Sequence, residues 1–361
     1  METLAIQTKS KQYPLYLGND SIHILSSLIS DLTPAASSIF IISDSVVSNH
    51  YMNHVKSCIP NDKNVFQFVI PAGEEQKSFE NYYACQTYAL ECGLDRNSLV
   101  LAFGGGVIGD FAGFIAATYM RGIRFIQIPT TLLAHDSAVG GKVAINHPLG
   151  KNMIGVFHQP EAVIYNLSFL DSLPEQEWRS GFAEVIKHSF ISKQNFFEWL
   201  QMNVHSLNDL QHEKLHEALK KAISVKANVI FQDETEQGVR AHLNFGHTLG
   251  HAIEAELGYG SITHGDAIAI GMQFALLLSE KVFQKDLQFV EKKTWFESYG
   301  YPKLPAHLTA EQLLERMKRD KKTKSGTIRM VLLKEIGCMQ LVEISDESIK
   351  ETLHEFIDSN S

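Results

Sequence analysis

The first 130 residues alternate short apolar runs with stretches of helical periodicity, and this alternation constrains the fold more than any other feature. Strands are predicted at residues 38–43, 65–70, 98–103 and 124–129, and helices at 78–92 and 107–119. The runs are largely apolar, which is typical of strands buried on both faces of a parallel sheet. Strands that alternate with helices therefore predict an α/β domain with a mostly parallel sheet and helices on both faces.

After about residue 167 the pattern changes to helices. Helical spacing covers residues 174–191, 195–200, 213–231, 245–257, 267–283, 287–298 and 310–319, with one possible strand at 327–333. A chain of 361 residues is long enough for two domains with large cores. We therefore predict an α/β domain at residues 1–167 and a mainly helical domain at residues 168–361.

Composition and charge exclude several classes of partner. The formal net charge of -9 argues against general binding to nucleic acid or to an anionic membrane, since both need a basic surface. The amino terminus lacks the features of a secretory signal, and no run approaches the ~18 apolar residues of a membrane span. The cysteines form no Cys-x-x-Cys pair, which favours a reducing compartment. We expect a cytoplasmic protein that acts on small molecules, with no nucleic-acid or membrane partner.

A glycine-rich loop follows the strand predicted at 98–103. Residues 104–109 satisfy Gly-x-Gly-x-x-Gly at the start of a helix. There, bare backbone lets a pyrophosphate approach and the helix N-terminus supplies amide donors, although a tight turn alone would also use glycines. The acidic residue usually found about 20 positions downstream is missing, because residues 123–131 contain no carboxylate. Asp44, which ends an earlier strand, is the better candidate for the ribose or adenine, and an ordinary Rossmann dehydrogenase is not expected.

The segment 240–254 concentrates polar groups and glycines. His247 and His251 are one helical turn apart, so both imidazoles can face one ligand or metal, whereas structural or surface histidines are the alternative interpretation. Gly246 and Gly250 each weaken a helix by about 1 kcal/mol relative to alanine, so they indicate close approach by another part of the molecule. Spacing alone does not decide between a metal site and a structural role.

Taken together, these segments resemble the 3-dehydroquinate synthase family over nearly the whole chain and in the expected order. The matching blocks are residues 73–78, 104–110, 117–123, 128–134, 136–142, 148–155, 181–187, 244–251, 264–266 and 320–322. Two departures stand out: the segment before Asp136 is one residue shorter than the usual form, and residues 74–76 lack the usual aromatic side chain. Neither departure affects a residue assigned to catalysis.

The resemblance implies an NAD-binding α/β domain followed by a helical metal-binding domain, and a homodimer. It implies conversion of 3-deoxy-D-arabino-heptulosonate 7-phosphate, a phosphorylated keto acid, into 3-dehydroquinate and phosphate. NAD+ would take a hydride from C5 as its hydroxyl is oxidised to a ketone, phosphate would leave, the hydride would return, and the ring would open and close again by an aldol step. One divalent metal, zinc or cobalt, would lower the pKa of the reacting alcohol, as it does for bound water.

The resemblance also implies roles for individual residues. The metal ligands would be Glu184, His247 and His264, which leaves coordination positions open for a substrate hydroxyl. His251 would then handle protons or support a ligand. The pocket for the substrate's phosphate and carboxylate would consist of Lys142, Lys151, Asn152, Lys187, Lys226, Arg240 and Asn244. Taken singly, each of these lysines could also be a solvated surface charge, and Glu184 a surface acid on a helix.

The remaining implied roles concern the cofactor and the second subunit. Asp136 would lie near the nicotinamide, Arg121 near the neighbouring subunit's active site, and one of Lys321 and Lys322 would reach the substrate. Cofactor contacts would come from Asp44, Gly73, Glu74, Glu75, Gln76, Lys77, Gly106, Val107, Ile108, Gly109, Asp110, Thr130, Thr131, Phe169, Leu170, Asp171 and Ser172, together with Lys142 and Lys151.

Three other functions are competing interpretations of these motifs. A cyclase acting on sedoheptulose 7-phosphate and an iron- or zinc-dependent polyol dehydrogenase would share the fold, and the dehydrogenase would release NADH. A non-catalytic NAD-binding regulator would require the loss of metal ligands or pocket residues, and none is missing. Lys226, Arg240, Asn244 and His251 favour a substrate that carries a carboxylate, because arginine pairs with carboxylate in a two-pronged geometry.

Overall fold

The chain forms two compact units, Met1–Leu173 and Pro174–Ser361. The computed structural model describes residues 1–258, 260–319 and 327–359, so Lys321 and Lys322 lie outside the described residues. The division falls later than the boundary predicted at residue 167, because Leu167–Ser172 forms a short 3-10 helix, η4, and its Phe169 packs in the core of the first unit. Each unit is described by itself below.

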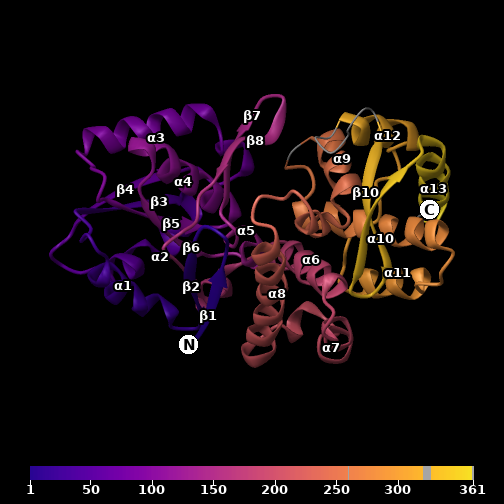
Figure 1. The fold of residues 1–361 in the computed structure, drawn as a ribbon, viewed down its shortest axis with the longest axis horizontal. Coiled ribbons are helices and arrows are strands. Elements are labelled where there is room, and N and C mark those ends of the chain that lie inside the picture. Colours follow the sequence, from indigo (N-terminus) through magenta and orange to yellow (C-terminus); the bar gives the residue numbers. More distant parts are fainter. Residues whose placement is uncertain (259, 320–326, 360–361) are drawn as a thin grey trace. The chain divides into compact units, whose positions relative to one another are not determined.

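The first unit is built on a mostly parallel sheet, which confirms the predicted fold class (Figure 1). Its described strands are β1 (Glu2–Gln7), β2 (Gln12–Gly18), β3 (Ser38–Asp44), β4 (Asn64–Ile70), β5 (Leu99–Gly104), β6 (Arg124–Pro129) and β9 (Ala162–Asn166). They lie in the order β1-β2-β9-β6-β5-β3-β4, and all neighbours are parallel except β1 and β2. The patterns of β1, β2 and β9 were not recognised in the sequence.

Helices cover both faces of this sheet (Figure 1). Phe40 and Ile42 of β3 pack in one core with α3 (Phe79–Glu91) and α4 (Gly106–Thr118). Ile39 and Ile41, the alternate residues of the same strand, pack in a second core with α1 (Leu25–Asp31) and α2 (Ser45–Ser57). Because successive side chains of a strand point to opposite faces, an apolar run is what a strand between two helical layers requires.

The order of the strands creates a switch point between β3 and β5. From β3 the chain passes to β4 on one side and then returns to place β5 on the other side. Ligands of open α/β sheets bind at the carboxyl ends of the strands at such a point. Ser43 pairs with Phe103, so Asp44 and Gly104 follow at neighbouring strand ends. A separate hairpin, β7 (Lys142–His147) and β8 (Gly150–Phe157), packs against α4 through β7.

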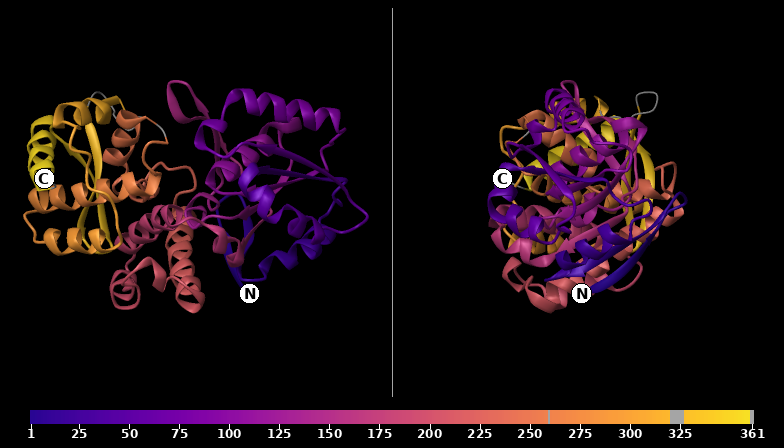
Figure 2. Two further views of the ribbon diagram at one scale, coloured as in Figure 1. Left: turned by 180° about the vertical axis from the view of Figure 1, so that it is seen from behind. Right: turned by 90° about the vertical axis from the view of Figure 1, so that its left-hand side faces the viewer.

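The second unit is mainly helical, as predicted. Its described helices are α6 (Glu175–Ile191), α7 (Phe196–Asn203), α8 (His212–Gln232), α9 (His247–Leu257), α10 (His264–Phe283), α11 (Phe289–Ser298), α12 (Ala310–Arg319) and α13 (Asp346–Asp358). The predicted late strand is β10 (Ile328–Glu335), which forms an antiparallel hairpin with β11 (Cys338–Ile344) and packs on α10 (Figure 2). The expectation of little sheet in this half therefore missed β11. No helix of the described residues has the length and apolar character that crossing a membrane requires.

Candidate active site

In the second unit, α6, α9 and α10 approach one another at glycines. A Cβ on Gly265 would lie 1.9 Å from the Ser180 carbonyl oxygen, and a Cβ on Gly271 would lie 2.0 Å from that of Gly246. A Cβ on Gly250 would lie 3.1 Å from the Ala267 carbonyl oxygen. The sequence prediction that Gly246 and Gly250 permit close approach is thus confirmed, and the approaching element is α10.

These contacts bring together the three residues that the sequence predicted as metal ligands. Glu184 lies on α6, while His247 and His264 are the first residues of α9 and α10. The Nε2 atoms of His247 and His264 both lie 3.6 Å from Glu184 Oε1. One potential ligand atom from each residue lies within 4.8 Å of the other two, and Glu184 is only 1% exposed. Separate helices thus converge on one small volume.

The second nitrogen of each imidazole has an acceptor of its own. His247 Nδ1 lies 3.2 Å from the Phe245 carbonyl oxygen, and His264 Nδ1 lies 3.2 Å from Glu254 Oε2. A neutral imidazole donates from one nitrogen and accepts at the other, so this arrangement leaves both Nε2 lone pairs toward Glu184. One carboxylate and two imidazoles, each oriented by an outer partner, fit a catalytic divalent metal.

The charges around this cluster also favour ligation. Lys187, on the next turn of α6, forms an ion pair with Glu184. Burial, reinforced by the Lys187 ammonium, holds the pKa of His247 well below its usual value. His247 is therefore neutral at neutral pH, which is the form that binds metals.

Buried cations lie on elements that pack against the cluster's helices. Lys187 of α6, Lys226 of α8 and Arg240 of η6 (Val239–Asn244) are 1%, 6% and 1% exposed, and their three elements contact one another. Positive charge that is concentrated in one place attracts anions, so these cations fit a pocket for an anionic substrate.

A structured loop holds Arg240 in place. The Asp233 carboxylate accepts the backbone N–H groups of Gln237, Gly238 and Arg240 at 3.0, 2.7 and 3.1 Å. Burial alone would raise the pKa of Asp233, but these three donors lower it overall. The Arg240 guanidinium donates to the Glu234 carbonyl oxygen, which fixes one side of its planar group.

The loop also carries an acid that the sequence reasoning missed. Asn244 Nδ2 donates to Glu236 Oε1 at 2.7 Å, so Glu236 orients a residue predicted to contact substrate. Glu236 adopts a positive φ of 60°, which is uncommon for a residue other than glycine. The sequence signal that could have revealed Glu236 was its place in the polar run 233–237, which ends three positions before Arg240. His251, one turn after His247, has its ring centroid 5.3 Å from that of His247 and 6.0 Å from that of His264.

In the first unit, the glycine loop presents bare backbone at the start of α4. Gly105 caps this helix without a side-chain hydrogen bond. A Cβ on Gly105 would lie 2.8 Å from Thr131 Cγ2, and one on Gly106 would lie 3.0 Å from Ser137 Oγ. Among the described residues, the hydroxyl oxygens of Thr130 and Ser137 are buried without a hydrogen-bond partner. Buried hydroxyls rarely lack partners, and here they accompany a helix N-terminus, so this loop fits a dinucleotide pyrophosphate.

Several predicted cofactor contacts form one ionic network beside the loop. Lys77 is 2% exposed, and its Nζ lies 2.8 Å from Asp110 Oδ2 and 3.2 Å from Glu74 Oε1. Burial alone would lower the pKa of Lys77, but the two carboxylates raise it overall. Burial raises the pKa of Asp110 despite the ammonium beside it. The network ties residues 74–77 to α4 through Asp110.

The β7–β8 hairpin joins this network through its polar residues. Asn146 Nδ2 donates to Glu74 Oε1 at 2.9 Å, and Lys151 Nζ lies 3.7 Å from Glu74 Oε2. The backbone N–H of Asn152 donates to Asn146 Oδ1 at 2.8 Å. These contacts place Lys151 and Asn152 beside residues 74–77, which were predicted to bind the cofactor.

The other residues predicted to bind the cofactor lie on different elements and differ in exposure. Phe169 and Leu170 are 1% and 0% exposed, and Phe169 packs in the core of the first unit. Asp44 uses Oδ1 to accept the N–H groups of residues 46 and 47 at the start of α2. Asp136 lies in the short helix α5 (Ala134–Ser137), and Lys142 is the exposed first residue of β7.

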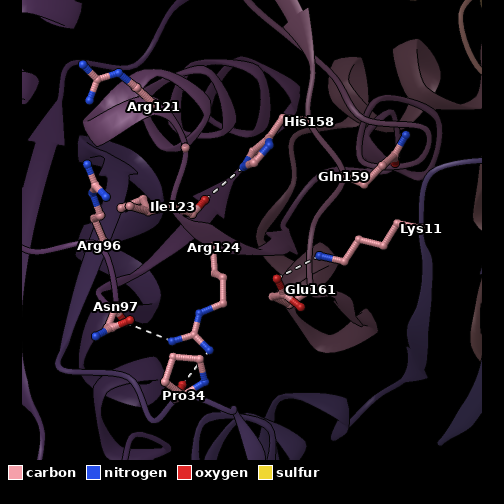
Figure 3. A pocket seen from close by; sticks show the side chains of 11 residues that line it. Lys11, Pro34, Arg96, Asn97, Arg121, Ile123, Arg124, His158, Gln159 and Glu161 are labelled. Carbon is pink, nitrogen blue, oxygen red and sulfur yellow. Dashed lines mark hydrogen bonds and ion pairs between the residues drawn. The ribbon is translucent and has the colours of Figure 1, made fainter.

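Arg121 lies at a basic pocket on the first unit (Figure 3). The pocket has a volume of about 380 Å³, and its charged residues are Lys11, Arg96, Arg121, Arg124 and Glu161. Lys11 pairs with Glu161 at 2.8 Å, and Arg124 donates to two backbone carbonyls. Arg121 itself has a positive φ of 69° in the turn between α4 and β6. Backbone strain of this kind is often retained where a side chain must be presented.

Comparison with known proteins identifies the family. Residues 67–180 match the sequence model described as 3-dehydroquinate synthase N-terminal, and residues 181–323 match 3-dehydroquinate synthase C-terminal. The chain belongs to the 3-dehydroquinate synthase family. A 3-dehydroquinate synthase of Bacillus cereus (strain AH820) is 59% identical over 356 residues, which are 99% of each chain. The resemblance inferred from the sequence motifs is thus confirmed.

Solved structures of related cyclases share the fold of this 3-dehydroquinate synthase family member. The structure of 2-deoxy-scyllo-inosose synthase complexed with carbaglucose-6-phosphate, NAD+ and Co2+ matches with a TM-score of 0.89 and 26% identity, covering 98% of this chain and 99% of that one. The 2-epi-5-epi-valiolone synthase ValA of Streptomyces hygroscopicus subsp. jinggangensis 5008, with NAD+ and Zn2+ bound, matches with a TM-score of 0.84 and 23% identity over 98% and 99% of the chains. At this identity the second match shows the fold alone.

Proposed function

We infer that the chain catalyses its family's reaction, the conversion of 3-deoxy-D-arabino-heptulosonate 7-phosphate into 3-dehydroquinate and phosphate, as a phosphorus–oxygen lyase of the shikimate pathway. The observation that carries this inference is the convergence of Glu184, His247 and His264 in a chain that matches the family from end to end. The chemistry requires a reversible oxidation, because a ketone acidifies the neighbouring C–H and so permits the loss of phosphate.

Two cofactors follow from the donor groups. We propose that Glu184, His247 and His264 hold one divalent metal, zinc or cobalt, and that the loop at 104–109 holds the pyrophosphate of NAD+. When bound, NAD+ supplies a reversible hydride acceptor and the metal lowers the pKa of the substrate hydroxyl. The structure of the related 2-deoxy-scyllo-inosose synthase, which contains NAD+ and Co2+, supports this assignment.

The remaining residues would bind and orient the substrate. Lys187, Lys226 and Arg240 offer buried positive charge to its phosphate and carboxylate, and Asn244 adds an amide held by Glu236. We propose that the planar Arg240 guanidinium selects a substrate with a carboxylate over sedoheptulose 7-phosphate, since a neutral hydroxymethyl group cannot accept two parallel hydrogen bonds. We propose that His251 moves protons rather than binding the metal.

An assay of phosphate release tests the activity. With the heptulosonate phosphate, catalytic NAD+ and a divalent metal, phosphate should appear over many turnovers without steady growth of NADH absorbance, and a chelator should stop the reaction. Stoichiometric NADH would instead identify a dehydrogenase. Comparison of kcat/KM for the heptulosonate phosphate and sedoheptulose 7-phosphate tests the carboxylate, and we expect a ratio of roughly a thousand-fold that collapses in Arg240→Ala. Equal use of both sugars by the wild type would contradict this role of Arg240.

We also propose a homodimer in which Arg121 reaches the neighbouring subunit's active site. Among the described strands, β8 pairs with β7 alone, and its Met153, Ile154 and Val156 are exposed, which is unusual for an edge strand that stays in water. Arg121→Ala and Glu184→Gln subunits, each weakly active alone, should recover activity when mixed and reassociated. A fully active monomer in sedimentation at assay concentration would refute the dimer, and failure of the mixture to recover would place Arg121 in its own subunit's site.

A cytoplasmic location is proposed on the basis of the cysteines. Cys58, Cys85, Cys92 and Cys338 are free thiols, and Cys58 and Cys85 are buried. Free cysteines without disulfides are typical of a reducing compartment. Fractionation of the native host, followed by immunodetection, tests this location directly.

A further inference from the structure

Glu254 contacts the second ring nitrogen of one candidate metal ligand. It lies on α9, is 5% exposed, and places Oε2 at 3.2 Å from His264 Nδ1 on α10. The other ring nitrogen of His264 lies 3.6 Å from Glu184 Oε1. The imidazole of His264 is therefore held between two buried carboxylates, one facing each nitrogen.

The other imidazole of the cluster is held differently. His247 Nδ1 meets the carbonyl oxygen of Phe245, a neutral acceptor only two residues away in the chain. His264 instead depends on a charged acceptor from a different helix. A carboxylate accepts a stronger hydrogen bond than a carbonyl does, and such an outer partner fixes the tautomer of a ligating histidine and raises its basicity.

We propose that Glu254 is a positioning residue of the metal centre, which holds the His264 ring with Nε2 facing Glu184 and strengthens the bond from His264 to the metal. The proposal rests on the metal centre inferred above. Glu254 acts through His264 and does not touch substrate. Sequence spacing gave no sign of this role, since Glu254 is simply one of the two acidic residues of α9.

Glu254 also neighbours His251, one turn before it on α9. Ligand atoms of His251, Glu254 and His264 lie within 4.8 Å of one another. These three residues could in principle form a second metal site, with Glu254 as a ligand. The distance of 3.2 Å from His264 Nδ1 to Glu254 Oε2 is that of a hydrogen bond, and the same ring already directs Nε2 to Glu184, which favours the positioning role.

The experiment measures metal binding rather than turnover. Metal-stripped full-length wild type and the variants Glu254→Gln, Glu254→Ala and Glu256→Gln are titrated with Zn2+ and with Co2+ against a chromophoric chelator. Glu256 is the matched control, because it lies on the same helix and pairs with Arg316 at 2.5 Å instead of with the cluster. Thermal unfolding of each metal-free variant reports folding independently of the metal.

We expect the wild type to bind one equivalent. Glu254→Ala should raise the Kd by about 10- to 100-fold, and Glu254→Gln by a smaller factor, because the amide keeps an acceptor oxygen but loses the charge. Glu256→Gln should bind like the wild type. The Co2+ absorption spectrum should shift in the two Glu254 variants and not in the control.

Each contrary outcome has a distinct meaning. Wild-type affinity and an unchanged Co2+ spectrum in both folded Glu254 variants would overturn the positioning role and leave the metal centre intact. Two equivalents in the wild type, with one lost in Glu254→Gln, would make Glu254 a ligand and overturn it as well. If the wild type bound no divalent metal, the proposed function itself would fail.

Discussion

Replacing Gly265 with alanine should disable the metal cluster by separating two helices. The added Cβ would lie 1.9 Å from the Ser180 carbonyl oxygen and 2.5 Å from its Cα and carbonyl carbon. These are backbone atoms of α6, so no side chain can rotate away. Glu184 lies one turn further along α6, and His264 directly precedes Gly265 on α10. The substitution therefore forces apart the two helices that carry Glu184 and His264.

The size of the effect follows from the required displacement. Ordinary van der Waals contact begins near 3.4 Å, whereas the added Cβ would lie only 1.9 Å from the Ser180 carbonyl oxygen. The two helix backbones must therefore move apart by about 1.5 Å to make room for it. Overpacking of a tight core costs about 1–3 kcal/mol, and more where backbone must move. Metal–ligand distances tolerate about 0.2 Å. A shift several times larger should therefore weaken metal binding by at least about 100-fold, even in molecules that remain folded.

Chelator competition with Zn2+ measures the affinity, and thermal unfolding of the metal-free protein measures the stability. Ser180→Ala is the control, because it removes the 3.1 Å hydrogen bond from the Gly265 N–H to Ser180 Oγ without adding volume. It should cost about 1 kcal/mol and leave the Kd for metal nearly unchanged. Wild-type metal affinity and stability in Gly265→Ala would refute the argument that this close approach sets the cluster geometry.

Three further predictions concern separate parts of the molecule. Glu184→Gln should lower metal occupancy and turnover by orders of magnitude, measured by metal analysis and phosphate release. His251→Ala should lower turnover and largely spare the metal. Loss of metal with turnover largely kept in His251→Ala would contradict the role assigned to His251. Lys77→Met should destabilise the fold by about 3 kcal/mol in urea unfolding, because it strips a buried cation from two carboxylates, and the added Asp110→Asn should restore part of the loss. Burial lowers the pKa of His158 below its usual 6.5, so the native state binds fewer protons than the unfolded state and stability should decline as the pH falls below about 6.5. An NMR titration of the His158 ring with a midpoint at or above 6.5 would contradict this.

Exposure to solvent explains some of the strands that the sequence analysis missed, but not all of them. The partly exposed strand β4 was predicted, whereas β9 was missed although it is buried along its whole length. Runs such as β3 and β5 are apolar along their length because helices cover both sides, and they were recognised. The edge strand β1 is exposed at alternate positions, and β8 is exposed along most of its length, so neither carries a comparable signal. Strand β11, with four exposed or half-buried residues in succession, also lacks a continuous buried run and was missed.

Part of the candidate site was also predicted from the sequence, and part was not. The glycine loop before α4 was predicted from its own residues, since a strand, a bare turn and a helix start all follow from one short segment. The three candidate ligands came from the family resemblance and not from spacing. Glu236 and Glu254 were missed, because each acts through a hydrogen bond to a residue on another turn or another helix.

What the sequence by itself determined is local: the period of the apolar residues, the need for glycine where backbone approaches, and the class of each domain. These properties are decided within a few residues, because side-chain direction and backbone freedom are set by the segment itself. Only the tertiary structure decided that Gly265 meets Ser180 and Gly271 meets Gly246, and hence that Glu184, His247 and His264 share one small volume. Such contacts arise from the packing of whole helices, where a backbone approach in one place fixes the distance between side chains in another.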